Sequence, residues 1–120
     1  MWYDVVWGGR LIPKSMEVSF ESGKHKKLCE NEKKIQRKYG SEQAEKILLR
    51  IRQFKAAVNL YDIYVLPQMR LHPLKENRNG CLAVDLLHPY RLVFRPVDGV
   101  LSDYATITKV MIINLREDYH

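Results

Sequence analysis

The stretch YRLVFR, residues 90–95, predicts a β-strand whose two faces differ in chemistry. Side chains alternate across a strand, so Tyr90 and Phe94 share one face while Arg91 and Arg95 share the other. An aromatic face has to be covered by other parts of the chain, whereas an arginine face can stay open to solvent. The stretch therefore predicts an α+β layer fold, with helices on one face of a sheet and an open surface on the other.

Two helices are expected to cover that sheet. Residues 24–39 predict a strongly basic helix in which Leu28 and Ile35 share one face, and Gly40 is suited to end it. Ser41 is expected to cap a second helix, whose apolar residues recur every three or four positions. These residues are Ala44, Ile47, Leu48, Ile51 and Phe54. Because the break between the helices is so short, we expect a two-helix hairpin packed on one face of the sheet.

The other strands are predicted by period-two patterns and turn residues. Met16–Phe20 alternates cleanly, and residues 69–74 and 81–87 flank an Asn79-Gly80 pair that is typical of a hairpin. The last strand is expected from Lys109 into the C-terminal residues. Short connections favour antiparallel neighbours, so the sheet is expected to be four- to five-stranded and mainly antiparallel.

Length and composition indicate a single domain with a basic surface. The chain has 120 residues and a formal net charge of +6, which suits a polyanionic partner such as RNA, DNA or the ribosome. Charge alone fits equally well a basic protein that is merely soluble. Residues 1–15 differ in composition, and we expect them to be an extension that precedes a domain of residues 16–120. The absence of a long apolar stretch or signal peptide, together with only two cysteines, predicts a cytoplasmic protein without membrane contact.

Several ionisable residues are predicted to gather on the open face or at its rim. His72, Lys75, Arg78, Arg91, Tyr119 and His120 come from the strands, the hairpin and the C-terminal segment. Taken singly, each is more simply a half-buried strand residue, a solvated turn or a frayed end. Together they suit metal-free RNA cleavage, which needs a base for the ribose 2′-OH, an acid for the leaving 5′ oxygen, and cations for the phosphorane. No cysteine, histidine or carboxylate cluster has the spacing of a metal site.

Two motifs carry a resemblance to a known family. They are LHPLK at residues 71–75 and EDYH at residues 117–120, with Arg78, Gly80 and Arg91 between them. Over about residues 16–120 the combination resembles the HigB toxins, the plasmid maintenance killer proteins of the RelE/ParE superfamily. This resemblance implies a RelE-like fold, and cleavage of mRNA in the ribosomal A site without a metal or other cofactor.

The resemblance also implies roles for individual residues. The positions that correspond to the family's active site are His72, Lys75, Arg91, Asp118, Tyr119 and His120. Lys75 and Arg91 are expected to bind the scissile phosphate, and His120 is expected to share the acid and base roles with His72 or Tyr119. Further RNA contacts are expected from Arg70, Arg78 and Arg95.

The partners implied by the resemblance are the ribosome, its mRNA and a cognate antitoxin. HigB toxins pair with a HigA-like helix-turn-helix antitoxin, and the pair contacts operator DNA through that antitoxin. Two alternatives stay open: a gyrase-directed toxin of the ParE branch, and an inactive relative that acts as a partner-binding module. The sequence departs from the family pattern at Asp85, because relatives carry a basic residue near the end of this strand.

Overall fold

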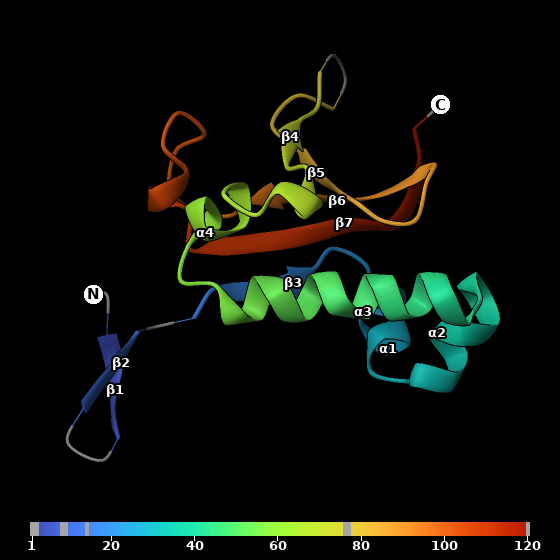
Figure 1. Cartoon of the computed structure of the whole chain (residues 1–120), viewed down its shortest axis with the longest axis horizontal. Helices are drawn as coiled ribbons and strands as arrows, with labels where there is room; N and C mark the ends of the chain where they lie inside the picture. The colour runs from blue at the N-terminus through green and yellow to red at the C-terminus, as the bar shows by residue number, and fades with distance from the viewer. Residues whose placement is uncertain (1–2, 8–9, 14, 76–77, 120) are drawn as a thin grey trace.

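The computed structural model describes residues 3–7, 10–13, 15–75 and 78–119, and the side chains of the last two ranges. Within this part of the chain there are four α-helices and two sheets (Figure 1). In chain order the elements are β1 (Tyr3–Trp7), β2 (Arg10–Pro13), β3 (Glu17–Phe20), α1 (Gly23–Cys29), α2 (Glu32–Tyr39), α3 (Ser41–Ala56), α4 (Leu60–Tyr64), the 3-10 helix η1 (Pro67–Met69), β4 (His72–Pro73), β5 (Leu82–Asp85), β6 (Tyr90–Pro96), the 3-10 helix η3 (Tyr104–Thr106) and β7 (Lys109–Asp118). The fold is α+β, as the sequence predicts.

The larger sheet has five strands in the order β3-β7-β6-β5-β4. The pairs β7–β6, β6–β5 and β5–β4 are antiparallel, whereas β3 and β7 run parallel, so the sheet is mixed. β7 lies between β3 and β6 and is hydrogen-bonded on both sides. The prediction that the chain's last residues continue a strand is confirmed as far as Asp118.

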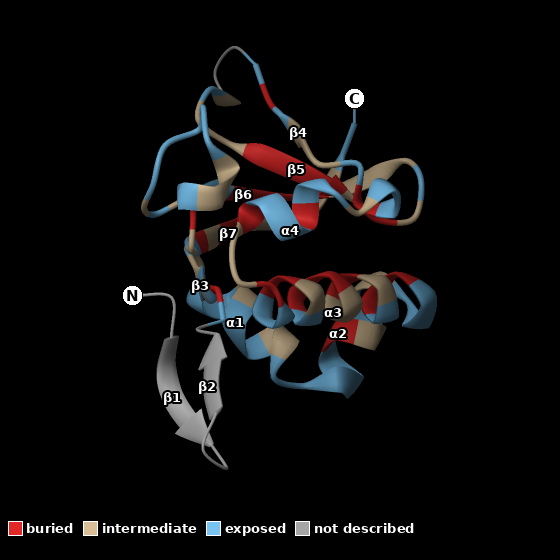
Figure 2. Ribbon diagram, turned by 60° about the vertical axis from the view of Figure 1, so that its left-hand side comes forward, coloured by how far each residue is buried: buried red, intermediate tan, exposed pale blue. Residues whose placement is uncertain are grey.

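Helices α2, α3 and α4 contribute buried residues to the main core, and Figure 2 shows buried residues along α3 next to the sheet. Phe54 of α3 meets Phe94 of β6 with ring centroids 4.9 Å apart, and both rings are fully buried. Burying one such side chain stabilises the fold by roughly 1.5–3 kcal/mol, so this contact fixes α3 over β6. On the opposite face, Val93 packs with Leu74 and Ala83 in a smaller cluster. The two faces predicted for β6 are therefore confirmed.

The single basic helix predicted for residues 24–39 is wrong, because the structure divides it into α1 and α2. The break lies at Asn31, whose backbone is extended and whose side-chain oxygen accepts a hydrogen bond from the Lys34 amide at 3.1 Å. Such a local bond starts a new helix rather than continuing the old one. The predicted cap is also wrong, since Gly40 takes the cap position of α3 and Ser41 is already helical.

The strand predicted for residues 69–74 is shorter than expected. Met69 ends η1 with its side chain fully buried in the main core. Arg70 follows in the left-handed region (φ 48°, ψ 48°), a conformation that is uncommon for residues other than glycine. This residue turns the chain, so pairing with β5 begins only at His72, opposite Ala83.

The N-terminal strands β1 and β2 form an antiparallel sheet of their own. The main core begins at Met16, which is 3% exposed and whose amide donates to the carbonyl of Ala57 at 2.8 Å. That residues 1–15 are an extension to a domain of residues 16–120 stays a prediction. None of the helices in the described part of the chain is both long and apolar enough to cross a bilayer.

Candidate functional site

Three strands place ionisable residues in a row across the face of the sheet that the helices leave uncovered, called the open face below. Asp85 of β5 pairs with Arg91 of β6, and Arg91 pairs with Glu117 of β7. Residues that are paired directly across strands point to the same face. The Tyr119 amide donates to the carbonyl of Pro89 at 3.1 Å, which holds the C-terminal segment beside this row.

Two arginines hold the carboxylate of Glu117. Nε and Nη2 of Arg91 lie 3.0 Å and 2.7 Å from Oε2, and Nη2 of Arg78 bonds to Oε1. The side chains of Arg91 and Glu117 are only 16% and 15% exposed, whereas Arg78 is 39% exposed. Since partial burial weakens screening by water, these charges interact more strongly than an exposed surface pair.

A second carboxylate, Asp85, orients Tyr119. The Tyr119 hydroxyl donates to Oδ1 of Asp85, and Nε of Arg70 lies 3.1 Å from Oδ2. The guanidinium of Arg91 lies 4.9 Å from the centroid of the Tyr119 ring, within the range of a cation–π contact. Burial, followed by the hydrogen bond and the charge of Asp85, raises the pKa of Tyr119 to about 12. At neutral pH the phenol therefore keeps its proton, which it shares in the hydrogen bond to Asp85.

His72 lies beside Tyr119 with a defined proton position. Its Nδ1 is 2.7 Å from the carbonyl oxygen of Arg70, and because a carbonyl can only accept, Nδ1 carries the proton. In the neutral ring, Nε2 is then the nitrogen that can accept a proton. The rings of His72 and Tyr119 are nearly parallel, 17° apart with centroids 6.0 Å apart. They border a hollow of about 670 Å³ that is lined by Arg70, Leu71, His72, Asp85, His88 and Tyr119.

The structure brings together part of the predicted site. His72, Arg91 and Tyr119 are neighbours on the open face, and two arginines predicted to bind RNA, Arg70 and Arg78, join them through the carboxylates. The sequence could show these residue types but not that each arginine would meet a carboxylate.

The other predicted residues have different positions. Lys75 is exposed on the connection between β4 and β5, and its carbonyl accepts a hydrogen bond from the Arg78 amide at 3.3 Å. Arg95 is exposed further along β6, with Nη2 3.4 Å from the sulfur of Met111. Asp118 pairs with Tyr90, and alternation along β7 points it to the face opposite Glu117. His120 lies outside the described residues.

Two buried polar residues of α3 that the sequence did not single out support the site. Nε of Arg50 donates to the carbonyl of Asp85 at 2.7 Å and Nη2 to that of Gln68 at 3.3 Å. Gln43 accepts from the amide of Leu87 at 3.1 Å and donates to its carbonyl at 3.3 Å. Burial lowers the pKa of Arg50. These bonds tie α3 to the backbone before β4, at the last residue of β5 and just after β5. The only signal in the sequence was a pair of polar residues seven positions apart within the apolar stripe of this helix.

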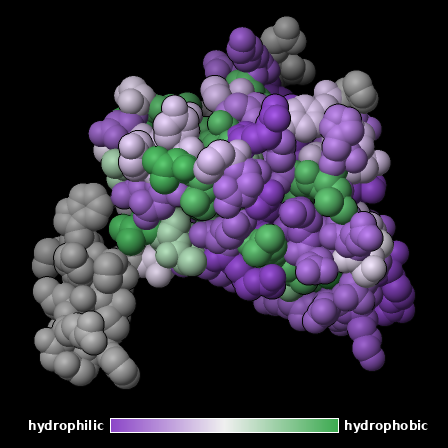
Figure 3. Space-filling view, in the orientation of Figure 1, coloured by the Kyte–Doolittle hydropathy of each residue, from purple (hydrophilic) through white to green (hydrophobic). Residues whose placement is uncertain are grey.

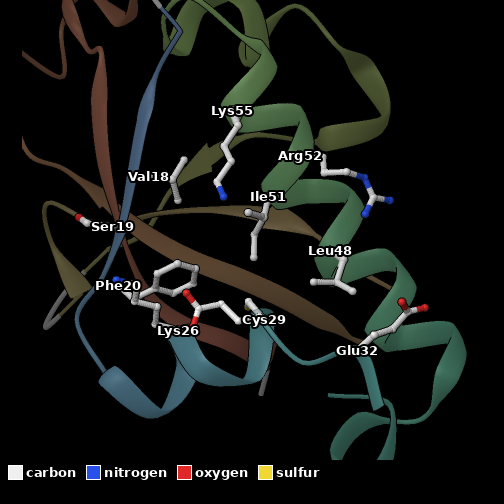
Figure 4. Close-up of a pocket in the computed structure, with 11 residues that line it drawn as sticks. Val18, Ser19, Phe20, Lys26, Cys29, Glu32, Leu48, Ile51, Arg52 and Lys55 are labelled. Atoms are coloured by element: carbon white, nitrogen blue, oxygen red, sulfur yellow. The ribbon is translucent and has the colours of Figure 1, made fainter. Parts of the chain in front are cut away.

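A second hollow, of about 580 Å³, lies between β3, α1 and α3 (Figure 4). Phe20, Leu48 and Ile51 give it apolar walls, and Lys55 reaches into it. Cys29 also lines it, but burial raises the pKa of this thiol to about 11, so it stays protonated at neutral pH and is a poor nucleophile. None of the residues predicted for catalysis or RNA binding lies here.

Among the residues that the structure describes, no group of three or more histidine, cysteine or carboxylate side chains could hold a metal ion. No protein-family model matches the sequence, and a search of curated proteins finds no match. The chemistry of the open face and the motif resemblance are therefore what bear on function.

Proposed function

We propose that this chain is a ribosome-dependent mRNA endonuclease, the toxin of a type II toxin–antitoxin system with a HigB-like active site on a RelE-like fold. The observation that carries the proposal is the convergence of an imidazole, a phenol and a guanidinium on one open face, from His72, Tyr119 and Arg91. These groups come from β4, β6 and the segment after β7, so the sheet brings together residues that lie far apart in the sequence. The resemblance at residues 71–75 and 117–120 points to the same reaction.

The chemistry is a transesterification that needs no metal. The ribose 2′-OH loses its proton and attacks the adjacent phosphorus, and the bond to the 5′ oxygen breaks as that oxygen gains a proton. The products are a 2′,3′-cyclic phosphate and a 5′-OH. Nε2 of His72 is suited to accept the first proton, and Tyr119 is suited to donate the second because its phenol carries a proton at neutral pH. By family resemblance His120 shares one of these roles, while Arg91 and Lys75 stabilise the phosphorane.

Two kinds of partner are proposed: the polyanionic RNA of the ribosome, and an antitoxin that inhibits the toxin. Figure 3 shows a hydrophilic surface where α1 and α2 lie. Its cations are Lys24, Lys26, Lys27, Lys33, Lys34, Arg37 and Lys38. A concentration of positive charge of this kind favours association with ribosomal RNA. A HigA-like helix-turn-helix antitoxin would neutralise the toxin in the cytoplasm, and operator DNA would be contacted through that antitoxin.

Expression in bacterial cells, with mRNA ends mapped by primer extension, tests the proposal. Wild type is expected to arrest growth and to produce new mRNA ends, and both effects should be lost in His72→Ala and His120→Ala. His25→Ala, which removes a histidine of α1, is the matched control and should behave as wild type. Full growth arrest by a folded His120→Ala protein would refute the assignment. DNA damage with intact mRNA would instead indicate a ParE-like toxin.

One observation favours a second candidate, an inactive module that binds a partner. Arg70, Arg78 and Arg91 are all paired with carboxylates, which reduces the positive charge that the open face offers to RNA. Normal growth during strong expression without an antitoxin would favour this candidate and exclude the nuclease.

A further inference from the structure

The carboxylate of Glu117 lies where an anionic ligand of the open face would have to bind. Arg91 directs two of its nitrogens at one carboxylate oxygen, and Arg78 directs one at the other oxygen. Two guanidinium groups that converge on adjacent oxygens are also the arrangement with which arginines bind a phosphate. Glu117 therefore presents to these arginines the same single negative charge and paired oxygens as a phosphodiester.

We propose that Glu117 is the resident anion of a two-arginine phosphate site, and that a phosphodiester of single-stranded RNA must displace it to reach Arg78 and Arg91. This inference rests on the proposed function and adds a residue that sets how tightly the site binds RNA. The carboxylate swings away as the phosphate enters, so one anion replaces another and the arginines are never left without a counter-charge.

The position of Glu117 makes this displacement possible. It lies near the end of β7, where the exposed residues Asp118 and Tyr119 follow, and Arg78 on the β4–β5 connection is itself 39% exposed. The site therefore opens toward solvent on the side of Arg78, while Arg91 is fixed by its place within β6. The cost of displacement is the loss of both ion pairs with Glu117, which lowers the affinity of wild type for RNA.

Binding of a short single-stranded oligoribonucleotide, measured by fluorescence anisotropy over a range of salt concentrations, tests the inference without ribosomes or cleavage. Glu117→Gln removes the competing charge and keeps the side-chain shape, so it should bind about tenfold more tightly than wild type, since about 1.4 kcal/mol corresponds to tenfold. In wild type the displaced carboxylate takes up a cation while the bound phosphate releases one. Glu117→Gln has no such carboxylate, so its slope of log affinity against log salt should be steeper by about 0.7.

The matched control is Glu17→Gln, which removes the same charge from β3. Glu17 is exposed and 3.8 Å from Lys109, so its loss should leave affinity and salt slope close to those of wild type. Adding Arg91→Ala to Glu117→Gln should abolish the gain. An equal gain in Glu17→Gln would show a mere effect of net charge and would overturn the proposal.

A second variant covers the case in which Glu117→Gln fails to fold because two arginines are left close together. Glu117→Asp keeps the charge but withdraws the carboxylate by one methylene, and should give an intermediate gain in affinity. Weaker binding than wild type by either folded variant would mean that Glu117 only positions the arginines, which refutes the inference. If the affinity gain appears but no variant cleaves mRNA in cells, the phosphate site stands and the nuclease assignment fails.

Discussion

Asp85→Asn is expected to lower the pKa of Tyr119 from about 12 to about 11. The substitution keeps the size of the side chain but removes its negative charge, leaving an amide oxygen as a weaker acceptor for the phenol. It tests whether the acidic residue that departs from the HigB pattern is part of the site.

The magnitude follows from the groups around the phenol. Burial is the largest cause of the raised pKa and is unchanged by the substitution, so part of the rise from 10.0 is retained. The hydrogen bond and the charge of Asp85 account for the rest, and both are weakened. Arg70, 3.1 Å from Asp85, also loses its counter-ion and then favours the phenolate more strongly. These changes act in the same direction, and together they amount to about one pH unit.

Tyrosinate absorbance during an alkaline titration measures this pKa. Subtracting the titration of a Tyr119→Phe version of each protein isolates Tyr119 from the other tyrosines. Glu17→Gln is the control, because it removes one charge far from the phenol. A pKa of Tyr119 that stays at about 12 in Asp85→Asn would refute the view that Asp85 tunes the phenol.

The same pKa gives a pH dependence of stability. Because Tyr119 holds its proton more tightly in the folded chain than in the unfolded chain, the stability it contributes is complete below about pH 10 and is lost as the pH rises toward about 12. Urea unfolding across this range should show that loss in wild type and a smaller loss in Tyr119→Phe.

Three further substitutions test the support of the site and the fold around it. Arg50→Met should lower the free energy of unfolding, measured in urea, by about 2 kcal/mol. Two backbone carbonyls lose their hydrogen-bond donor, which outweighs the relief of no longer burying a cation. An unchanged free energy of unfolding would show that these two hydrogen bonds do not support the site. Gly99→Ala should destabilise the fold by at least about 2 kcal/mol more than Gly80→Ala. Both glycines have a positive φ, but only at Gly99 would an added Cβ meet a backbone atom, the Thr106 carbonyl oxygen at 2.4 Å. Equal losses of stability in the two variants would contradict this reasoning. Lys75→Ala should reduce mRNA cleavage by about 100-fold with no change in melting temperature, and full cleavage would remove this exposed cation from the mechanism.

Local patterns predicted the parts of the fold that depend on neighbours in the chain. The alternation in β6 correctly predicted which side chains face the helices, because it needs only the pleat of one strand. The division between α1 and α2 was missed because Asn31 lies among charged residues that suit a helix as well as a break. The length of β4 was overestimated because the Met69 side chain is buried in the core and Arg70 adopts a left-handed conformation. The strand propensities of these residues do not show either feature.

The composition of the site depended on strand register, which the sequence alone does not give. A shift of one residue between β6 and β7 would place Asp118 opposite Arg91 and turn Glu117 to the helix-covered face. The pairing is also irregular between Arg91 and Val93, so counting residues back from a turn would have given the wrong partner. The residue types could therefore predict a face rich in arginine, but not that carboxylates would pair with those arginines.

The position of Tyr119 depends on α3 as much as on β7. Gln43 binds both backbone groups of Leu87, and the Tyr90 amide donates to the same Leu87 carbonyl at 3.0 Å, which fixes the turn between β5 and β6. Pro89 in that turn accepts the hydrogen bond of the Tyr119 amide. A residue so close to the end of a strand would otherwise fray. Gln43 of α3 therefore helps to hold the backbone of Tyr119 in place through the turn between β5 and β6. This role gives a reason for a buried polar side chain within the apolar stripe of α3.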